Sequence, residues 1–300
     1  MMGGQVTTNL DYSYISAFKN IYSITSESDF TYSTLDTDII DLSQIDSDAT
    51  SKYLVTKQII SGLGALGIDS VSVATEHIVD FTDDIFKNTV NLLNQNKIYA
   101  AGLIDTPVYL QKGNKKIAII SANDVIIGTS TNYTRNSINI YDKEKMKQDI
   151  LTAKQNADFV IVAINWGKEY TYGVTDRMKQ IAQNSIDDGA DLIVGTNSLG
   201  IYPLTEYNEK PIIYSTGYLM SDLDYNLAKQ GCIFNIDINN KNKIEEIDMI
   251  PIYIENKKKV QLYSNYNYDE ANEYIKQINN WNQQNGLNSN IANDIIKIIF

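Results

Sequence analysis

The chain has 300 residues, of which 43% are hydrophobic, so it is large enough for one α/β domain with a sizeable core. Its formal net charge of −12 argues against nucleic-acid binding, because phosphate contacts require clustered Lys and Arg side chains. Cys232 is the single cysteine, which excludes an internal disulfide and a zinc site built from several cysteines.

The sequence carries no recognisable targeting segment. No apolar run reaches the ~18 residues that a membrane-spanning helix requires. The first ten residues have neither the basic region nor the apolar region of a signal peptide. We therefore expect any export signal or anchor of the native protein to lie outside this sequence.

The first half of the chain alternates short apolar runs with amphipathic segments. We predict helices over residues 53–66, 83–96 and 142–156, and strands over 29–32, 70–74, 99–102, 108–110 and 116–122. The strand at 70–74 leads directly into a loop that contains His77, the only histidine. This alternation of elements favours an α/β fold.

The clearest structural signal lies at residues 158–222. Residues 158–164, DFVIVAI, are an almost unbroken apolar run, which is typical of a strand buried on both faces. A polar, aromatic loop follows at 165–173, and the next predicted helix ends at Gly189. Residues 190–195 form a second buried strand. Because α/β proteins concentrate their chemistry in loops at the C-terminal ends of strands, the loops after these two strands are candidate sites.

After residue 222 the pattern changes to antiparallel strands and one helix. We predict strands over 232–238, 243–250 and 251–254, and a helix over 269–283. All four prolines are expected at loop or strand edges. We divide the chain into a layered α/β domain at 1–254 and a C-terminal helical extension at 255–300 that packs on it.

Five collinear groups of residues form a recognisable set. They are SDFTYSTLDT at 28–37, SVATEHIVD at 72–80, NWGKEY at 165–170, residues 187–199, and STGYL at 215–219. The set resembles the motifs of the CapA/PgsA family of poly-γ-glutamate capsule biosynthesis proteins, over about residues 1–254. The resemblance implies a calcineurin-like metallophosphoesterase fold, which is an α/β/β/α sandwich.

The same resemblance implies where a metal centre would lie, and several of its ligands are replaced here. Asp36 stands at the family's Glu and Glu76 at its metal-binding Asn, whereas His77 keeps the family's histidine. The family's remaining metal-site histidines fall on Asn165, Thr196, Asn197 and Leu199. The family's first motif, G-D-x-M-x-G, would place its Asp just before Met1, outside this sequence.

These replacements weaken the case for metal chemistry. A two-metal hydrolytic site needs about five to seven N or O ligands around metals ~3.5–4 Å apart. Asn and Thr bind transition metals more weakly than His, and Leu199 cannot bind a metal at all. We therefore expect no cofactor, with one divalent cation (Mg²⁺, Ca²⁺ or Mn²⁺) held by Asp36 and Glu76 as the alternative.

Individual residues keep two interpretations at this stage. His77 is either a retained general acid or phosphate contact, or an orienting residue held by hydrogen bonds. Trp166 and Tyr170 either line a ligand cleft or pack over the strand ends. Glu169 and Asp176 are an acid/base pair or solvated side chains. The full set that we expect in the binding cleft is Asp36, Glu76, His77, Asp80, Asn165, Trp166, Glu169, Tyr170, Thr196, Asn197 and Tyr218.

The resemblance implies two functions of different classes. The first is a non-catalytic CapA-like protein that binds or organises an anionic polymer or membrane synthase components at the extracellular face of a bacterial membrane. The second is a metal-dependent hydrolase with an altered metal site, acting on a phosphoester or on an amide of the polymer. The sequence predicts neither the ligand nor the oligomeric state.

Overall fold

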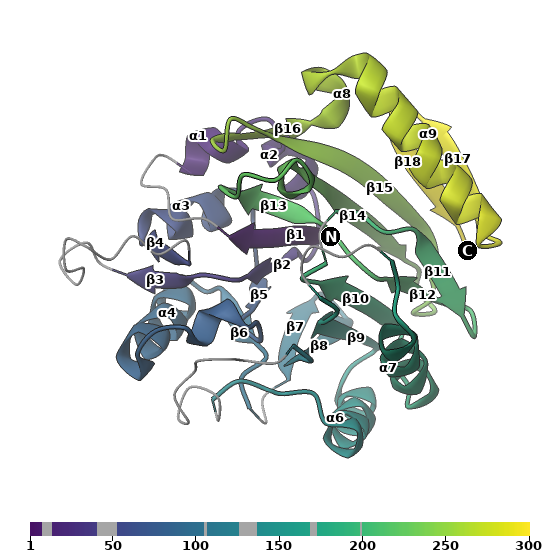
Figure 1. The fold of residues 1–300 in the computed structure, drawn as a ribbon. Coiled ribbons are helices and arrows are strands. Elements are labelled where there is room, and N and C mark those ends of the chain that lie inside the picture. The colour runs from purple at the N-terminus through teal and green to yellow at the C-terminus, as the bar shows by residue number, and fades with distance from the viewer. Residues whose placement is uncertain (8–13, 41–52, 105–106, 126–136, 169–172, 199) are drawn as a thin grey trace.

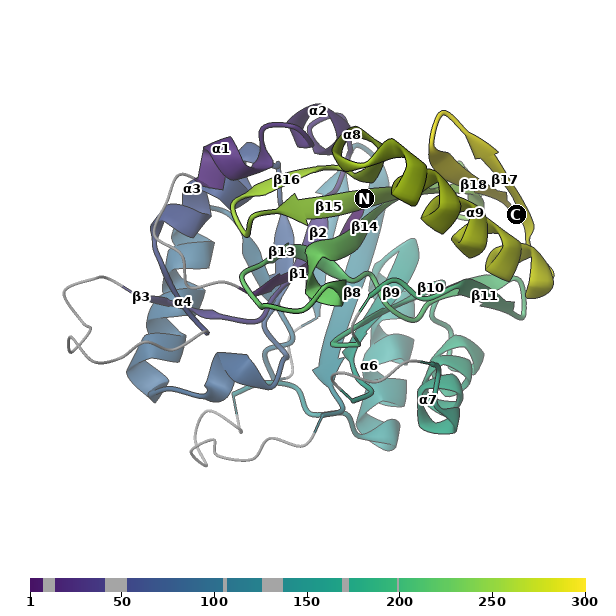
Figure 2. The same cartoon turned by 45° about the horizontal axis from the view of Figure 1, so that its top comes forward.

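The computed structural model describes residues 1–7, 14–40, 53–104, 107–125, 137–168, 173–198 and 200–300. Two β-sheets pack face to face, and helices cover their outer faces (Figures 1 and 2). This is the predicted α/β/β/α sandwich, which is therefore confirmed.

The first sheet has ten strands in the order β17-β18-β15-β14-β1-β2-β5-β6, with β13 beside β1 and β16 beside β15. Its strands are β1 Met2–Thr7, β2 Tyr32–Leu35, β5 Ser70–Ser72, β6 Tyr99–Ala101, β13 Tyr218–Ser221, β14 Gln230–Ile238, β15 Ile244–Glu255, β16 Lys259–Leu262, β17 Asn288–Ala292 and β18 Ile295–Ile299. From β13 and β1 to β6 the pairs are parallel, and from β14 to β17 they are antiparallel.

The second sheet has six strands in the order β11-β12-β10-β9-β8-β7. Its strands are β7 Val108–Lys112, β8 Lys115–Asn123, β9 Phe159–Asn165, β10 Leu192–Thr196, β11 Leu204–Tyr207 and β12 Lys210–Ile213. The four central strands are parallel, and the edge strands β7 and β11 each join their neighbour as an antiparallel hairpin. All four central strands therefore end at the same edge of the sheet.

Most of the helices form the two outer layers, whereas α9 packs beside β17 and β18 against the core between the sheets (Figure 2). They are α1 Tyr14–Phe18, α2 Tyr22–Thr25, α3 Gln58–Ala65, α4 Asp83–Gln95, α6 Lys143–Asn156, α7 Asp176–Asp187, α8 Tyr263–Tyr266 and α9 Tyr268–Gln284. Helices α1, α3 and α4 share a core with the first sheet, whereas α6 and α7 share one with the second. No helix within the described ranges combines the length and the apolar character that crossing a membrane requires.

Strand β9 shows why its sequence is an unbroken apolar run. Successive side chains of a strand point to opposite faces. Phe159, Ile161 and Ala163 enter the core between the two sheets, and Val160, Val162 and Ile164 enter the core beneath α6 and α7. Both faces of β9 are therefore dry, as the sequence predicts.

Several predictions on element boundaries are wrong. The strand predicted at 29–32 lies at Tyr32–Leu35, and the strands predicted at 243–250 and 251–254 are the single strand β15. Residues 53–66 are not one helix, because Leu54–Thr56 form β4, which pairs in parallel with β3 (Asp38–Ile40) before α3 begins. Pro251 is not at a strand edge but lies inside β15. That strand pairs with β18 through residues 246–249 and with β16 through residues 252–255. On this side Pro251 falls between the two partners, and on the other side it faces Cys232 of β14, whose own N–H bonds to Thr216. A proline is tolerated in a strand at a position where its N–H is not needed for pairing.

The segment after residue 254 contains more than a helix. Helix α9 forms as predicted, and its side chains Ile275 and Ile278 enter the core between the sheets. Strands β16 and β18 both pair with β15, and β17 completes a hairpin with β18. The Ile-rich tail is a strand because its alternate residues Ile296 and Ile298 are buried on one face. The helical description of residues 255–300 is therefore incomplete.

A substitution at Gly195 in β10 tests how closely Trp166 and Tyr214 pack against this strand. A Cβ atom at this position would lie 2.3 Å from Trp166 Nε1 and 2.3 Å from the carbonyl oxygen of Tyr214. We expect Gly195→Ala to lower the free energy of unfolding by about 1–3 kcal/mol or more, measured by urea denaturation.

Gly64 provides the matched control for this substitution. It is exposed within α3, and a Cβ atom there would meet nothing within 4 Å. Because Ala favours a helix over Gly by up to about 1 kcal/mol, Gly64→Ala should leave the stability unchanged or raise it. Equal losses in the two variants would contradict the close packing at Gly195.

Candidate functional site

The polar residues predicted from the sequence gather where the parallel strands of both sheets end. Asp36 follows β2 and Glu76 follows β5 in the first sheet, whereas Asn165 and Thr196 are the last residues of β9 and β10 in the second. The two sheets are connected just below this edge, because the hydroxyl groups of Ser72 and Ser121 lie 2.6 Å apart. The C-terminal strand ends thus form one shared polar edge.

Asp36 is fully buried at this edge, and both of its carboxylate oxygens accept hydrogen bonds. Gln5 Nε2 donates to Asp36 Oδ2 at 2.6 Å. The backbone N–H of His77 donates to Asp36 Oδ1, with a nitrogen-to-oxygen distance of 3.3 Å. Asp36 therefore ties the loop after β5 to the first strand of the sheet.

Glu76 is held by amide side chains from the second sheet. Asn165 Nδ2 donates to Glu76 Oε2 and also to Asn123 Oδ1, the latter at 3.0 Å. Thr196 Oγ1 donates to Asn165 Oδ1 at 3.2 Å. All four side chains are buried. Asn165 is thus the hub of a network that joins the ends of β8, β9 and β10 to the loop after β5.

Burial has a large effect on the charge of Glu76. It raises the pKa of the Glu76 carboxyl from its usual range to about 8, and the neighbouring negative charge of Asp36 adds to the increase. His77 and the hydrogen bond from Asn165 act in the opposite direction but do not outweigh the burial. Glu76 is therefore mainly protonated and uncharged at neutral pH.

His77 is fixed by contacts on three sides. Its Nδ1 lies 2.7 Å from Asp80 Oδ2, and its backbone N–H is the one that reaches Asp36. Its ring stacks on Tyr53, with ring centroids 3.5 Å apart and planes 8° from parallel. A histidine paired with a carboxylate in this way can accept or donate a proton at its other ring nitrogen. The same contacts also suit a residue that only orients the loop.

The residues at this edge do not fit a metal centre as they are arranged. Within the described ranges, no group of three or more His, Cys, Asp or Glu side chains is placed to hold an ion. Asn165 presents its N–H group to Glu76, and an N–H group cannot coordinate a cation. The Asp36 oxygens are turned to the N–H groups of Gln5 and His77. We therefore derive no chemical step through a metal.

Trp166 does not line a cleft. Its side chain is fully buried, and its Nε1 donates to the carbonyl oxygen of Tyr214 at 3.0 Å. The absence of a Cβ atom at Gly195 leaves the space that the indole fills. The sequence interpretation that placed Trp166 in the binding cleft is therefore wrong, and the alternative, packing over the strand ends, describes it.

The remaining predicted residues fall into three groups. Asn197 is buried with a left-handed backbone (φ 79°), and its amide oxygen and nitrogen have no hydrogen-bond partner in the described part of the chain. Tyr218 is buried in β13 opposite Gln5, the residue that holds Asp36. Glu169 and Tyr170 lie outside the described residues.

Sequence reasoning missed three residues of the network. Asn123 ends the buried strand β8 just as Asn165 ends β9, so the strand-end rule used for the other loops could have found it. Gln5 and Tyr53 gave no such signal, because they reach the site through pairing and stacking between distant segments. Arg177, on α7, binds the carboxylate of Asp124 through two nitrogens beside this hub.

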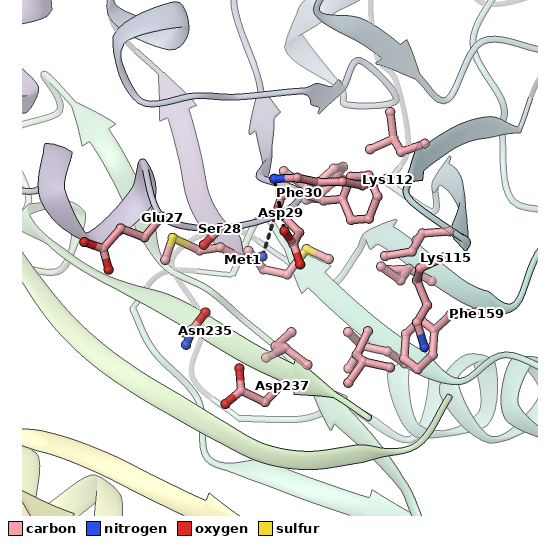
Figure 3. A pocket seen from close by; sticks show the side chains of 18 of the residues that line it. Met1, Glu27, Ser28, Asp29, Phe30, Lys112, Lys115, Phe159, Asn235 and Asp237 are labelled. Carbon is pink, nitrogen blue, oxygen red and sulfur yellow. Dashed lines mark hydrogen bonds and ion pairs between the residues drawn. The ribbon is translucent and has the colours of Figure 1, made fainter. Parts of the chain in front are cut away.

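A large cavity lies between the sheets at the opposite edge, near the first residues of the parallel strands (Figure 3). Its volume is about 1070 Å³, and its lining includes Met1, Lys115, Phe159 and Asp237. The Met1 nitrogen donates to the carbonyl oxygen of Phe30 at 2.6 Å. None of the predicted site residues lines this cavity.

Comparison with solved structures defines the class of fold. A hypothetical protein from Thermus thermophilus matches with a TM-score of 0.57 and 11% identity, over 85% of this chain and 98% of that one. A putative 5′-nucleotidase from Staphylococcus aureus matches with a TM-score of 0.54 and 12% identity, over 93% of this chain and 58% of that one. The chain has the calcineurin-like metallophosphoesterase fold.

Sequence comparison is more specific. The profile of a family described as "Bacterial capsule synthesis protein PGA_cap" matches residues 1–223, and the chain belongs to this family. The PGA biosynthesis protein CapA of Bacillus subtilis (strain 168) is 25% identical over 210 residues, which are 66% of this chain and 54% of that protein. The capsule biosynthesis protein CapA of Bacillus anthracis is 22% identical over 211 residues, 66% of this chain and 51% of that protein. The chain spans about half the length of these relatives.

The raised pKa of Glu76 predicts how stability depends on pH. Between pH 4.5 and about 8 the folded protein keeps a proton on Glu76 that the unfolded chain has lost, so this group lowers the stability as the pH rises. Glu76→Gln resembles the protonated acid at every pH. We expect its stability advantage over the wild type to grow by up to roughly 1.4 kcal/mol per pH unit in that window.

Urea unfolding of both proteins at pH 5 and pH 8 measures this difference. Asp176→Asn is the matched control, because the side chain of Asp176 is fully exposed, and its effect should be the same at both pH values. A Glu76→Gln advantage that does not increase with pH would contradict the buried, protonated state of Glu76.

Proposed function

We propose that this protein is a CapA-like component of poly-γ-glutamate capsule biosynthesis that binds or organises polymer or synthase partners without hydrolysing them. We place its action at the extracellular face of a bacterial membrane. Family membership and the names of the curated relatives support the capsule process. The non-catalytic role, the partners and the location are our own inferences.

One observation carries the non-catalytic part of the proposal. The carboxylates at the edge of the sheets are held by uncharged amide groups, with Asn165 on Glu76 and Gln5 on Asp36. In a two-metal hydrolase the corresponding groups would converge on cations and share a bridging oxygen. Here these carboxylates make hydrogen bonds to amide side chains instead. This supports a site that binds a partner without catalysing a reaction.

The charge of the protein affects whether it can bind the proposed anionic polymer. The formal charge of −12 would repel a polyanion, yet that value counts every carboxyl group as ionised. Burial raises the pKa of Glu76 to about 8 and that of Asp38 well above its usual range. Both groups lie at or next to this edge, so its local negative charge is smaller than the formal charge suggests. Lys168 and Arg177 are exposed in the segments that follow β9, and Arg177 already pairs with Asp124.

The second candidate is a metal-dependent hydrolase with an altered site. The observation in its favour is that His77, paired with Asp80, lies directly beside Asp36 and Glu76. A cation bound there would have to displace the Asn165 amide from Glu76 and ionise its carboxyl. The two candidates therefore differ in whether added metal binds and produces turnover.

The first test measures metal content and hydrolysis. We expect protein dialysed against Mn²⁺ and Mg²⁺ to retain far less than one metal ion per chain. Turnover of bis-p-nitrophenyl phosphate and of γ-glutamyl amides should be the same as in His77→Ala. The Asn165→His variant, which returns the family's histidine, is the control for a site that gains affinity. Stoichiometric metal, together with turnover lost in His77→Ala, would overturn the non-catalytic assignment in favour of the hydrolase.

The binding part of the proposal has a separate test. We expect poly-γ-glutamate to bind saturably, and the affinity to fall as ionic strength rises because the contacts are between charges. The double variant Lys168→Ala, Arg177→Ala should bind several-fold more weakly, by roughly 1 kcal/mol. Lys241→Ala is the matched control, since Lys241 is exposed in the β14–β15 turn, at the opposite edge of the sheet. Equal loss in the control, or no binding, would contradict a polymer site at this edge.

A further inference from the structure

A groove of about 670 Å³ lies beside the candidate site, at the same edge of the second sheet. One wall comes from the segments that follow β9, β10 and β12, including Gly173, Tyr202 and Tyr214. The other wall is α9. The volume is in the range of pockets that hold organic ligands, ~300–1,000 Å³.

Helix α9 has one face for the core and another for the groove. Ile275, Ile278 and Asn282 are buried, and Asn282 Oδ1 accepts a hydrogen bond from the backbone N–H of Leu204 at 2.9 Å. This contact fixes the helix against β11. A second stripe of side chains, at helical spacing, lines the groove: Tyr274, Gln277, Trp281 and Gln284. The opposite walls of the groove are thus held at a fixed distance.

The charge of the groove differs from that of the whole chain. None of its described lining residues is Asp or Glu, although 37 of the 300 residues are acidic. Its only described cation is Lys179, which already lies 3.4 Å from Asp176. The groove therefore offers almost no positive charge to a polyanion and no carboxylate to a cation. The groove therefore matches an uncharged ligand.

The kinds of side chain in the groove narrow the ligand further. Tyr274 and Trp281 are half-buried aromatic side chains, so part of each lies at the surface. Gln277, Gln284 and Asn285 are exposed amides that can both donate and accept hydrogen bonds. Sugar rings combine an apolar C–H face, which stacks on aromatic rings, with hydroxyl groups that pair with amides. Apolar peptides would leave these amides without partners.

We propose that this groove binds a neutral saccharide chain, stacked on Trp281 and hydrogen-bonded to the amides of α9. The site is independent of the capsule function proposed above, because it shares no residue with the network around Glu76. A carbohydrate contact would hold the protein against a glycan surface while the neighbouring edge remains open. Tyr202 and Tyr214 are the buried part of the wall that faces α9.

Calorimetric titration with chitotetraose and with maltotetraose tests the proposal. We expect saturable binding of at least one of them, with a dissociation constant between about 0.1 and 5 mM, as is usual for few-contact ligands. The chain has two tryptophans, and Trp166 is fully buried, so a change in tryptophan fluorescence on binding reports Trp281. Uncharged ligands should bind equally well in low and high salt.

Variants separate the groove from the rest of the surface. We expect Gln277→Ala, Gln284→Ala to weaken binding at least about fivefold, and Trp281→Ala by about tenfold or more. The two glutamines are exposed, so their removal leaves the core unchanged even where Trp281→Ala destabilises the fold. Asn280→Ala, at an exposed position of α9 outside the groove lining, should have no effect.

Four outcomes would overturn the assignment. The first is no saturable binding of either sugar up to about 10 mM. The second is binding that survives the glutamine and tryptophan substitutions. The third is saturable binding of tetra-γ-glutamate, and of neither sugar, that is lost in the same variants, because that result would assign the groove to the acidic polymer. The fourth is concentration-dependent dimerisation lost in Trp281→Ala, without sugar binding, which would assign the groove to a second copy of the chain.

Discussion

The hydrogen bond from Asn165 to Glu76 is the contact on which the polar edge depends. Glu76 lies in the loop after β5 of the first sheet, and Asn165 ends β9 of the second. The same amide donates to Asn123 and accepts from Thr196. A buried carboxyl group without such a partner would be costly, because its oxygens would lose the hydrogen bonds of water. The amide satisfies the acid without supplying charge. This explains how two acidic side chains can lie side by side at the meeting point of two sheets.

A single buried layer separates this polar edge from the aromatic groove. Trp166 follows the strand that carries Asn165, and its indole N–H bonds to the backbone of Tyr214. Tyr214 in turn lines the groove beneath α9. The small residue Gly195 lets the indole lie against the strand. The two surfaces therefore share one rigid, close-packed support.

Local sequence predicted much of the fold and less of the site. The apolar run in β9 and the amphipathic helices follow from the periodic burial of their side chains. Strand ends indicated the loops that carry Asn165 and Thr196, whereas Asp36 and Glu76 came from the family resemblance. The contacts that hold those residues, from Gln5 and Tyr53, join segments far apart in the chain and leave no local pattern. Trp166 was ambiguous because a tryptophan in a polar loop looks the same whether it is exposed or buried. Pro251 was misplaced because its tolerance depends on which neighbours pair with β15.

The position of β1 has a consequence for synthesis on the ribosome. Met2 pairs with Tyr32 on one side but with Phe234 on the other, and Gln5 pairs with Tyr218. One edge of this strand therefore stays without its partners until more than two hundred further residues have emerged. Contacts of such long range slow folding and expose an unpaired edge in the meantime. That edge of β1 stays unpaired until β13 and β14 close the sheet.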